Sequence, residues 1–220
     1  MELLREGFAV ADTLKPDRLV IGVRSDRTEA ILREVYAPIT DQDVPLLVTD
    51  FPTAELVKVA ANSFLATKIS FINAMAEVCE AAGADVVKLA EAIGYDPRIG
   101  NRFLAAGLGF GGGCLPKDIR AFMARAGELG AEEALTFLRE VDQINMRSRA
   151  HTVDLATKLL GGSLRGKRIC VLGATFKPDS DDVRDSPSLD VAVAMNNAGA
   201  EVTVHDPKGL ENAERVYPNM

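Results

Sequence analysis

A cysteine follows a run of glycines near the middle of this chain, in the stretch GLGFGGGCLPKD that spans residues 107–118. Five glycines in seven positions leave this loop almost without Cβ atoms, so its backbone can approach a ligand closely. Pro116 fits the first turn of a helix, which places Cys114 where a loop enters a helix N-terminus, beside Lys117. Both features favour the thiolate, and Asp118 follows within one helical turn. A thiolate, a cation and a carboxylate in one loop predict covalent catalysis on a polar or phosphorylated substrate.

This stretch also has an ordinary interpretation. A lone cysteine is most often a small core residue, and a cluster of glycines is most often a turn. The choice between the two interpretations therefore depends on the rest of the chain.

Three polar residues on a long predicted helix form a second candidate group. Glu55, Lys58 and Asn62 are spaced three and four residues apart, so they share one helix face. Lys58 and Asn62 interrupt a largely apolar stretch, so one interpretation is a lysine and an amide that point into a site. The alternative is a solvated stripe on a surface helix.

A second loop, from Ala174 to Ser186, lies between a predicted strand and a predicted helix. In doubly wound folds such a loop lies at the edge where ligands bind. Lys177 and Arg184 are suited to hold phosphates there, unless the loop is a self-paired surface segment. The start of the loop lacks the G-x-G-x-x-G fingerprint, so this half does not bind a dinucleotide through its own first turn.

The composition excludes several classes of protein. The chain has 220 residues, a net charge of −7 and no basic cluster, which argues against nucleic-acid binding. It has no apolar run long enough for a membrane span, and its first residues carry charges of both signs, unlike a signal peptide. Three widely separated cysteines suit a reducing cytoplasm, and two distant histidines form no zinc site.

The spacing of apolar residues predicts an α/β chain with a long helical middle. Ser25 or Asp26 is expected to cap a helix that Pro38 stops. The expected strands cover residues 18–23, 45–50, 166–173 and 201–206, and the expected helices cover residues 27–36, 52–82, 85–93, 117–126, 132–160 and 187–199.

Three parts follow from this pattern: residues 1–50, 51–162 and 163–220. The first is a strand–helix–strand piece that is expected to be the tail of a larger domain, because it cannot close a core alone. The second is helical. The third is a βαβ unit of a Rossmann-like sheet, which we expect to be cut short as well.

Four blocks, in order, resemble the UDP-glucose/GDP-mannose dehydrogenase family of nucleotide-sugar 6-dehydrogenases. They are ELLREG with PDR at residues 2–18, ELVKVAAN at residues 55–62, the stretch from Arg98 to Asp118, and the stretch from Gly173 to Pro187. The resemblance covers essentially the whole chain, and the third block is the most specific. This sequence departs from the family pattern at Gly113, where serine is usual, and it lacks the glycine fingerprint of the NAD domain.

The resemblance implies an architecture and partners. The fold class is α/β, with a helical dimerisation domain and its long central helix between the remnant of an NAD-binding Rossmann domain and part of a UDP-sugar-binding Rossmann-like domain. It also implies a cytoplasmic homodimer, joined through the central domain, that uses NAD. The implied reaction is the two-step oxidation of UDP-glucose to UDP-glucuronate through a cysteine thiohemiacetal and thioester.

The resemblance also assigns roles to individual residues. Those at catalytic positions are Cys114 as nucleophile, Lys58, Asp118, Asn62 and Glu2. Those at positions around the nucleotide sugar are Arg98, Phe103, Leu104, Phe110, Gly111, Phe176 and Lys177, and Arg98 is expected to reach the sugar of a neighbouring subunit. Those at cofactor-contacting positions are Glu6, Lys117 and Arg184, and no metal is implied.

Two alternatives remain open from the sequence. One is GDP-mannose as the substrate, since that branch of the family shares the cysteine loop and the long helix. The other is a non-catalytic dimerisation and nucleotide-sugar-binding fragment. Since the chain has no dinucleotide fingerprint, we expect it to be inactive when it stands alone.

Overall fold

The computed structural model of this chain describes residues 4–218. It contains two compact units, Met1–Ala61 and Asn62–Met220, and helix α3 (Phe51–Ala82) runs from the first into the second. No helix within the described residues combines the length and the apolar character that crossing a bilayer demands.

The first unit is built around two parallel strands. Helix α1 (Ala9–Leu14) precedes β1 (Leu19–Gly22), and α2 (Asp26–Thr40) connects β1 to β2 (Leu46–Thr49). Leu19 of β1 pairs with Leu46 of β2, and the register continues to the ends of both strands. This arrangement matches the predicted strand–helix–strand order.

The two ends of α2 test the predicted helix signals. Ser25 is the N-cap, because its side chain accepts a hydrogen bond from the Thr28 N–H. The prediction that Pro38 stops the helix is wrong. Proline removes only its own N–H, and the final turn closes through the Asp41 N–H, which donates to the carbonyl of Ala37 at 2.9 Å.

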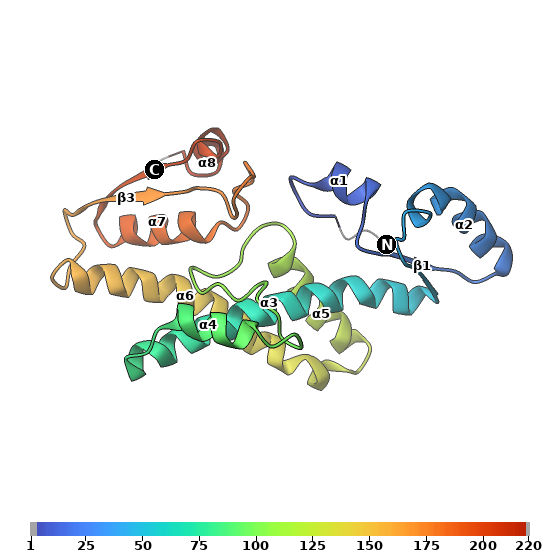
Figure 1. The fold of residues 1–220 in the computed structure, drawn as a ribbon. Helices are drawn as coiled ribbons and strands as arrows, with labels where there is room; N and C mark the ends of the chain where they lie inside the picture. The colour runs from blue at the N-terminus through green and yellow to red at the C-terminus, as the bar shows by residue number, and fades with distance from the viewer. Residues whose placement is uncertain (1–3, 219–220) are drawn as a thin grey trace. The chain divides into compact units, whose positions relative to one another are not determined.

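The helical part of the second unit packs α3 against two later helices (Figure 1). It contains α4 (Val86–Gly94), α5 (Leu115–Glu128), the short 3-10 helix η1 (Glu132–Leu135) and α6 (Thr136–Leu159). Their core consists of buried side chains from α3, α5, α6 and the glycine-rich loop: Ala66, Phe110, Ile119, Leu138 and Val141. The Ser70 hydroxyl also donates to the carbonyl of Val141 at 2.7 Å, which ties α3 to α6.

The second unit ends in the predicted βαβ arrangement. Strands β3 (Arg168–Leu172) and β4 (Glu201–His205) are parallel, and α7 (Pro187–Asn197) connects them and packs on α6 (Figure 1). Helix α8 (Leu210–Val216) was not predicted, since its seven residues are too few to show an apolar period. It forms because Ala213 packs into a cluster with Ala174 and Leu189.

Candidate active site

Cys114 is the N-cap residue of α5, as the proline two positions later predicts. The cysteine is exposed, and its carbonyl accepts a hydrogen bond from the Asp118 N–H at 2.8 Å. Its side chain therefore lies where the cysteine loop enters α5, at the N-terminal end of that helix. This position leaves the sulfur reachable from solvent.

Asp118 is buried in the first turn of α5 and has two partners there. Asn62 of α3 donates from Nδ2 to Asp118 Oδ2 at 2.7 Å. Lys117 places its ammonium 3.4 Å from the other carboxylate oxygen. The carboxylate is thus fixed on the helix that begins at Cys114, and it has a neutral donor on one side and an exposed cation on the other.

The glycine-rich loop before Cys114, here called the cysteine loop (residues 107–114), is held by an amide on α6. Asn145 is buried, and its Oδ1 accepts from the Phe110 N–H at 2.7 Å while its Nδ2 donates to the Phe110 carbonyl at 3.0 Å. Gly109 has a φ of +96°, and a Cβ there would collide with the Asn145 side chain. Glycine is therefore required at this position by a protein contact.

The cysteine loop also packs against the second loop (residues 174–186). The Gly112 N–H donates to the carbonyl of Arg184 at 3.0 Å. A Cβ at Gly111 would collide with the Asp185 carbonyl, and a Cβ at Gly112 would lie 2.6 Å from the Phe176 ring. The sequence suggested that these glycines admit a ligand, whereas in the structure they admit another segment of the chain.

Arg149 connects the two loops. This residue of α6 is only 4% exposed, and its Nη2 donates to the Phe110 carbonyl at 2.9 Å. Its Nη1 donates to Asp185 at 2.9 Å and also pairs with Asp190 of α7. One guanidinium thus contacts the cysteine loop, the second loop and the helix that follows it.

Asp206 anchors the start of the second loop from the end of β4. Its carboxylate accepts hydrogen bonds from the backbone N–H groups of Ala174, Thr175, Lys208 and Gly209 at 2.6–3.4 Å. Burial alone raises the pKa of this carboxyl, but the four N–H groups outweigh burial and lower the pKa to about 2. The charged carboxylate therefore stabilises the turn after β3 and the turn before α8.

The predicted substrate positions differ in their surroundings. Phe110 and Leu104 are buried, and Phe110 belongs to the helical core, so its backbone is the part that faces the loop partners. Phe103 is half-exposed with a φ of +64°, which is uncommon for a bulky residue. Lys177 lies over the Phe176 ring at 5.4 Å, and Arg98 is exposed and paired with Asp96, whose pKa it lowers.

Some predicted residues lie outside this group. Lys58 and Glu6 belong to the first unit, whereas Cys114, Asn62 and Asp118 belong to the second. Lys58 lies one turn before Asn62 on α3, so its catalytic role stays a prediction. Glu2 lies outside the described residues.

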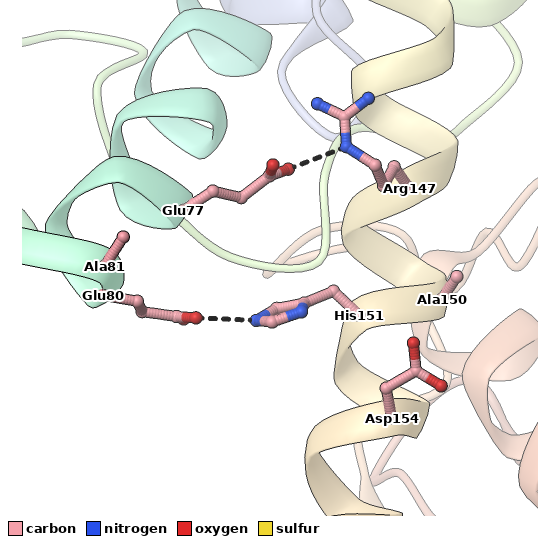
Figure 2. Close-up of a pocket in the computed structure, with 7 residues that line it drawn as sticks. All are labelled: Glu77, Glu80, Ala81, Arg147, Ala150, His151 and Asp154. Carbon is pink, nitrogen blue, oxygen red and sulfur yellow. Dashed lines mark hydrogen bonds and ion pairs between the residues drawn. The ribbon is translucent and has the colours of Figure 1, made fainter.

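A hollow of about 400 Å³ lies elsewhere in the second unit, between α3 and α6 (Figure 2). Two pairs of side chains meet across it: Arg147 Nε lies 3.0 Å from a carboxylate oxygen of Glu77, and His151 Nε2 lies 2.9 Å from one of Glu80. None of the predicted site residues lines it. Within residues 4–218, no group of three or more His, Cys, Asp or Glu side chains is arranged to hold a metal ion.

The sequence analysis missed Asn145, Arg149 and Asp206. Asn145 and Arg149 continue the three- and four-residue spacing of Leu138 and Val141 on α6. A polar residue on the apolar face of a helix is a signal of a buried, partnered side chain, and this signal was present. Asp206 gave a weaker signal, since an acidic residue after a strand is common in turns.

Three domain models of one family match the chain. Residues 1–40 match the NAD binding domain of the UDP-glucose/GDP-mannose dehydrogenase family, residues 52–147 its central domain and residues 170–220 its UDP binding domain. Cys114, Asn62 and Asp118 all lie in the part that matches the central domain. The second loop lies in the part that matches the UDP binding domain.

Individual relatives agree with these models. The chain is 47% identical to a UDP-glucose 6-dehydrogenase of Rickettsia bellii and 45% identical to one of Rhizobium meliloti; the alignments cover 99% and 100% of this chain and 50% of each relative. A UDP-glucose dehydrogenase structure from Pyrobaculum islandicum has 44% identity and a TM-score of 0.93, over 99% of this chain and 49% of that one. The chain thus spans about half the length of the relatives that it matches.

Proposed function

Because the chain belongs to the UDP-glucose/GDP-mannose dehydrogenase family, we propose that it carries the thiol chemistry of an NAD-dependent, two-step oxidation of UDP-glucose to UDP-glucuronate. The observation that carries this proposal is the Asn62–Asp118 pair on the helix that begins at the exposed Cys114. The relatives that are 45% and 47% identical to this chain are named UDP-glucose 6-dehydrogenases, which favours a uridine over a guanosine nucleotide.

NAD supplies the hydride acceptor for both oxidations when it is bound. The described residues offer cations for it, since Lys117 and Arg184 are exposed near Cys114. The turns after β1 and after β3 both lack the glycine fingerprint that holds a pyrophosphate at a helix N-terminus. The residues present therefore suit the thiol chemistry, but they do not form the glycine-rich turn that binds the pyrophosphate of a dinucleotide.

Cys114 is the nucleophile in this proposal. Its thiolate adds to the C6 aldehyde left by the first oxidation, which forms a C–S bond and a thiohemiacetal oxyanion. When NAD is bound, it would accept the hydride that C6 of this adduct loses, and the adduct would become a thioester. Water then attacks the carbonyl, the C–S bond breaks, and its electron pair returns to sulfur as the carboxylate leaves.

Asp118 and Asn62 serve the hydrolytic step. The Asp118 carboxylate is within one helical turn of the sulfur and accepts the proton of the attacking water. The Asn62 amide holds Asp118 by one hydrogen bond and keeps it oriented. Lys58, one turn before Asn62 on α3, is proposed to stabilise the oxyanion.

A homodimer is part of the proposal. Phe64, Phe71 and Val78 recur at every seventh residue of α3 and are 66%, 47% and 56% exposed. Large apolar side chains repeated along one helix face favour burial against a second helix. We propose that a second copy of α3 covers this stripe.

The C6 aldehyde of UDP-glucose tests the thiol step without any cofactor. We expect the wild-type chain to bind this aldehyde about tenfold or more tightly than it binds UDP-glucose, because a C–S bond forms only with the aldehyde. The Cys114→Ser variant should lose this difference, and Cys170→Ser should keep it. Calorimetric titration measures both affinities, and equal affinities in the wild type would contradict the proposal.

A nucleotide comparison tests the base. The same titration with UDP and GDP should show binding of UDP and weaker binding of GDP. Tighter binding of GDP would move the assignment to a guanosine sugar and leave the thiol chemistry in place.

A further inference from the structure

Arg149 has more partners than a residue that only fills space. Its guanidinium contacts the Phe110 carbonyl in the cysteine loop, Asp185 in the second loop and Asp190 at the start of α7. Its Nε is buried and has no hydrogen-bond partner among the described residues. This side chain therefore carries the cost of burying a charge, and its partners lie on three separate segments.

The segments joined by Arg149 are already close to one another. Gly112 donates to the Arg184 carbonyl, and Gly111 admits the Asp185 backbone, so the two loops pack without Cβ atoms between them. Glycines contribute no side chains that could hold the two loops together. The planar, charged guanidinium of Arg149 reaches both loops from α6 and fixes them by hydrogen bonds.

Cys114 follows this constrained stretch directly. Three residues separate it from Phe110, whose carbonyl and N–H are held by Arg149 and by Asn145 one helical turn earlier on α6. A shift of the Phe110 backbone would therefore change the backbone conformation at Cys114 and the direction of its side chain at the N-terminus of α5. Buried ion pairs add little net stability, so geometry is the stronger reason for this arrangement.

We propose that Arg149 is a positioning residue, which holds the cysteine loop and the second loop in one arrangement and thereby fixes the direction of the Cys114 side chain at the N-terminus of α5. The effect of this positioning on catalysis rests on the proposed function. The second loop, in the part that matches a UDP binding domain, would then be coupled to the thiol through one side chain.

The three cysteines of the chain provide an internal test. Cys114 and Cys170 are exposed and Cys79 is buried, so Cys114 reports on the loop, Cys170 serves as a reference and Cys79 reports on global unfolding. The rate of alkylation by iodoacetamide near neutral pH is followed for each cysteine by mass spectrometry. In the Arg149→Met variant we expect the ratio of the Cys114 rate to the Cys170 rate to fall about threefold or more, since the Cys114 side chain then turns away from the first turn of α5.

The matched control is Arg147→Met, which removes an arginine from the same helix. Arg147 pairs with Glu77 of α3, and within the described residues no hydrogen bond or ion pair joins its side chain to either loop, so its removal should leave the ratio unchanged. The Asp190→Asn variant removes one partner of Arg149 and leaves the arginine in place. It should lower the ratio by a smaller factor than Arg149→Met does. If Arg149→Met does not fold, the Asp190→Asn variant alone tests the proposal.

Amide hydrogen exchange supplies a second measurement on the same proteins. Arg149→Met should speed exchange in residues 108–114 and 176–186 together by about tenfold, with α3 and α6 unchanged. An unchanged or increased Cys114 ratio in folded variants would overturn the proposal, and so would Cys79 becoming reactive together with Cys114. If UDP does not bind the wild type but the ratio responds as expected, the proposed function falls and the positioning role stands.

Discussion

Asn62 and Asp118 are 56 residues apart in the chain, and they meet through a hydrogen bond of 2.7 Å between Nδ2 and Oδ2. The bond joins the long helix α3 to the first turn of α5, directly after Cys114. It is the contact through which two separate sequence motifs become one candidate site.

The Asn62→Ala variant removes this donor from a buried carboxylate. We expect the free energy of unfolding to fall by about 1–3 kcal/mol, because a charged group then loses a hydrogen bond and regains little water. Urea denaturation measures the loss. Asn197→Ala, at the exposed end of α7, is the control and should change stability by less than about 0.5 kcal/mol. Equal losses of unfolding free energy in both variants would show that the Asn62–Asp118 hydrogen bond stabilises the fold no more than an exposed side chain does.

The Lys58→Ala variant should lower turnover far more than it weakens substrate binding. The ammonium is proposed to stabilise an oxyanion that exists only along the reaction path, and loss of one such group costs about 100- to 1,000-fold in rate. Steady-state kinetics in a form of the enzyme that turns over separates the two effects. A rise in KM with kcat unchanged would make Lys58 a binding contact.

The apolar stripe of α3 predicts the oligomeric state. Substituting Phe64 and Phe71 by glutamate should shift the chain from dimer to monomer, because two charges would have to be buried against a second copy. Sedimentation velocity at micromolar concentration gives the mass of each species. The double substitution Leu155→Glu and Leu159→Glu on α6, which are also exposed, tests whether any added charge has this effect. A monomeric wild-type chain would contradict the prediction.

Asp206 predicts a pH dependence of stability. Its pKa is lowered from 3.8 to about 2 by backbone N–H groups, so the charged form is preferred in the folded state. This stabilisation is complete above the unfolded value of 3.8 and is lost as the pH falls towards 2. Asp206→Asn should therefore be less stable by about 2 kcal/mol at neutral pH, roughly one charge-assisted hydrogen bond, with a smaller difference in acid.

Thermal unfolding across this pH range measures the Asp206 effect. Glu214→Gln removes an exposed carboxylate of α8 and serves as the control. If the gap between wild type and Asp206→Asn stays constant from neutral pH down to pH 2, the carboxylate charge is not what stabilises the turns.

The 220-residue chain is not expected to oxidise UDP-glucose with NAD. Neither of its βα turns has the glycine fingerprint, and positioning NAD requires a strand–turn–helix that holds the pyrophosphate. Absorbance of NADH at saturating substrate is the direct measurement, with a UDP-glucose 6-dehydrogenase that contains the fingerprint as the positive control. Robust NADH formation would show that the cofactor binds in a way that this sequence does not reveal.

Local chemistry in the sequence determined the secondary structure and the position of the thiol. The three- and four-residue apolar spacing of α3, the Ser25 cap and Pro116 at the start of α5 act over one or two turns, so a reader of the sequence can use them directly. Helix α8 went unpredicted because it is short and packs through Ala213 against Ala174 and Leu189, which are distant in the chain. The last turn of α2 went unpredicted because Pro38 predicts a stop, although a local hydrogen bond closes that turn.

Only the tertiary structure decided what the glycines and the buried polar residues of the second unit do. Gly109, Gly111 and Gly112 are needed because Asn145 and the second loop occupy the space that their side chains would fill. The apolar spacing of α6 marks Arg149 as a buried position, but its partners appear only when α6 brings it to Phe110 and Asp185. Partners of a buried polar group come from distant parts of the chain, so their identity depends on packing and leaves no local pattern in the sequence.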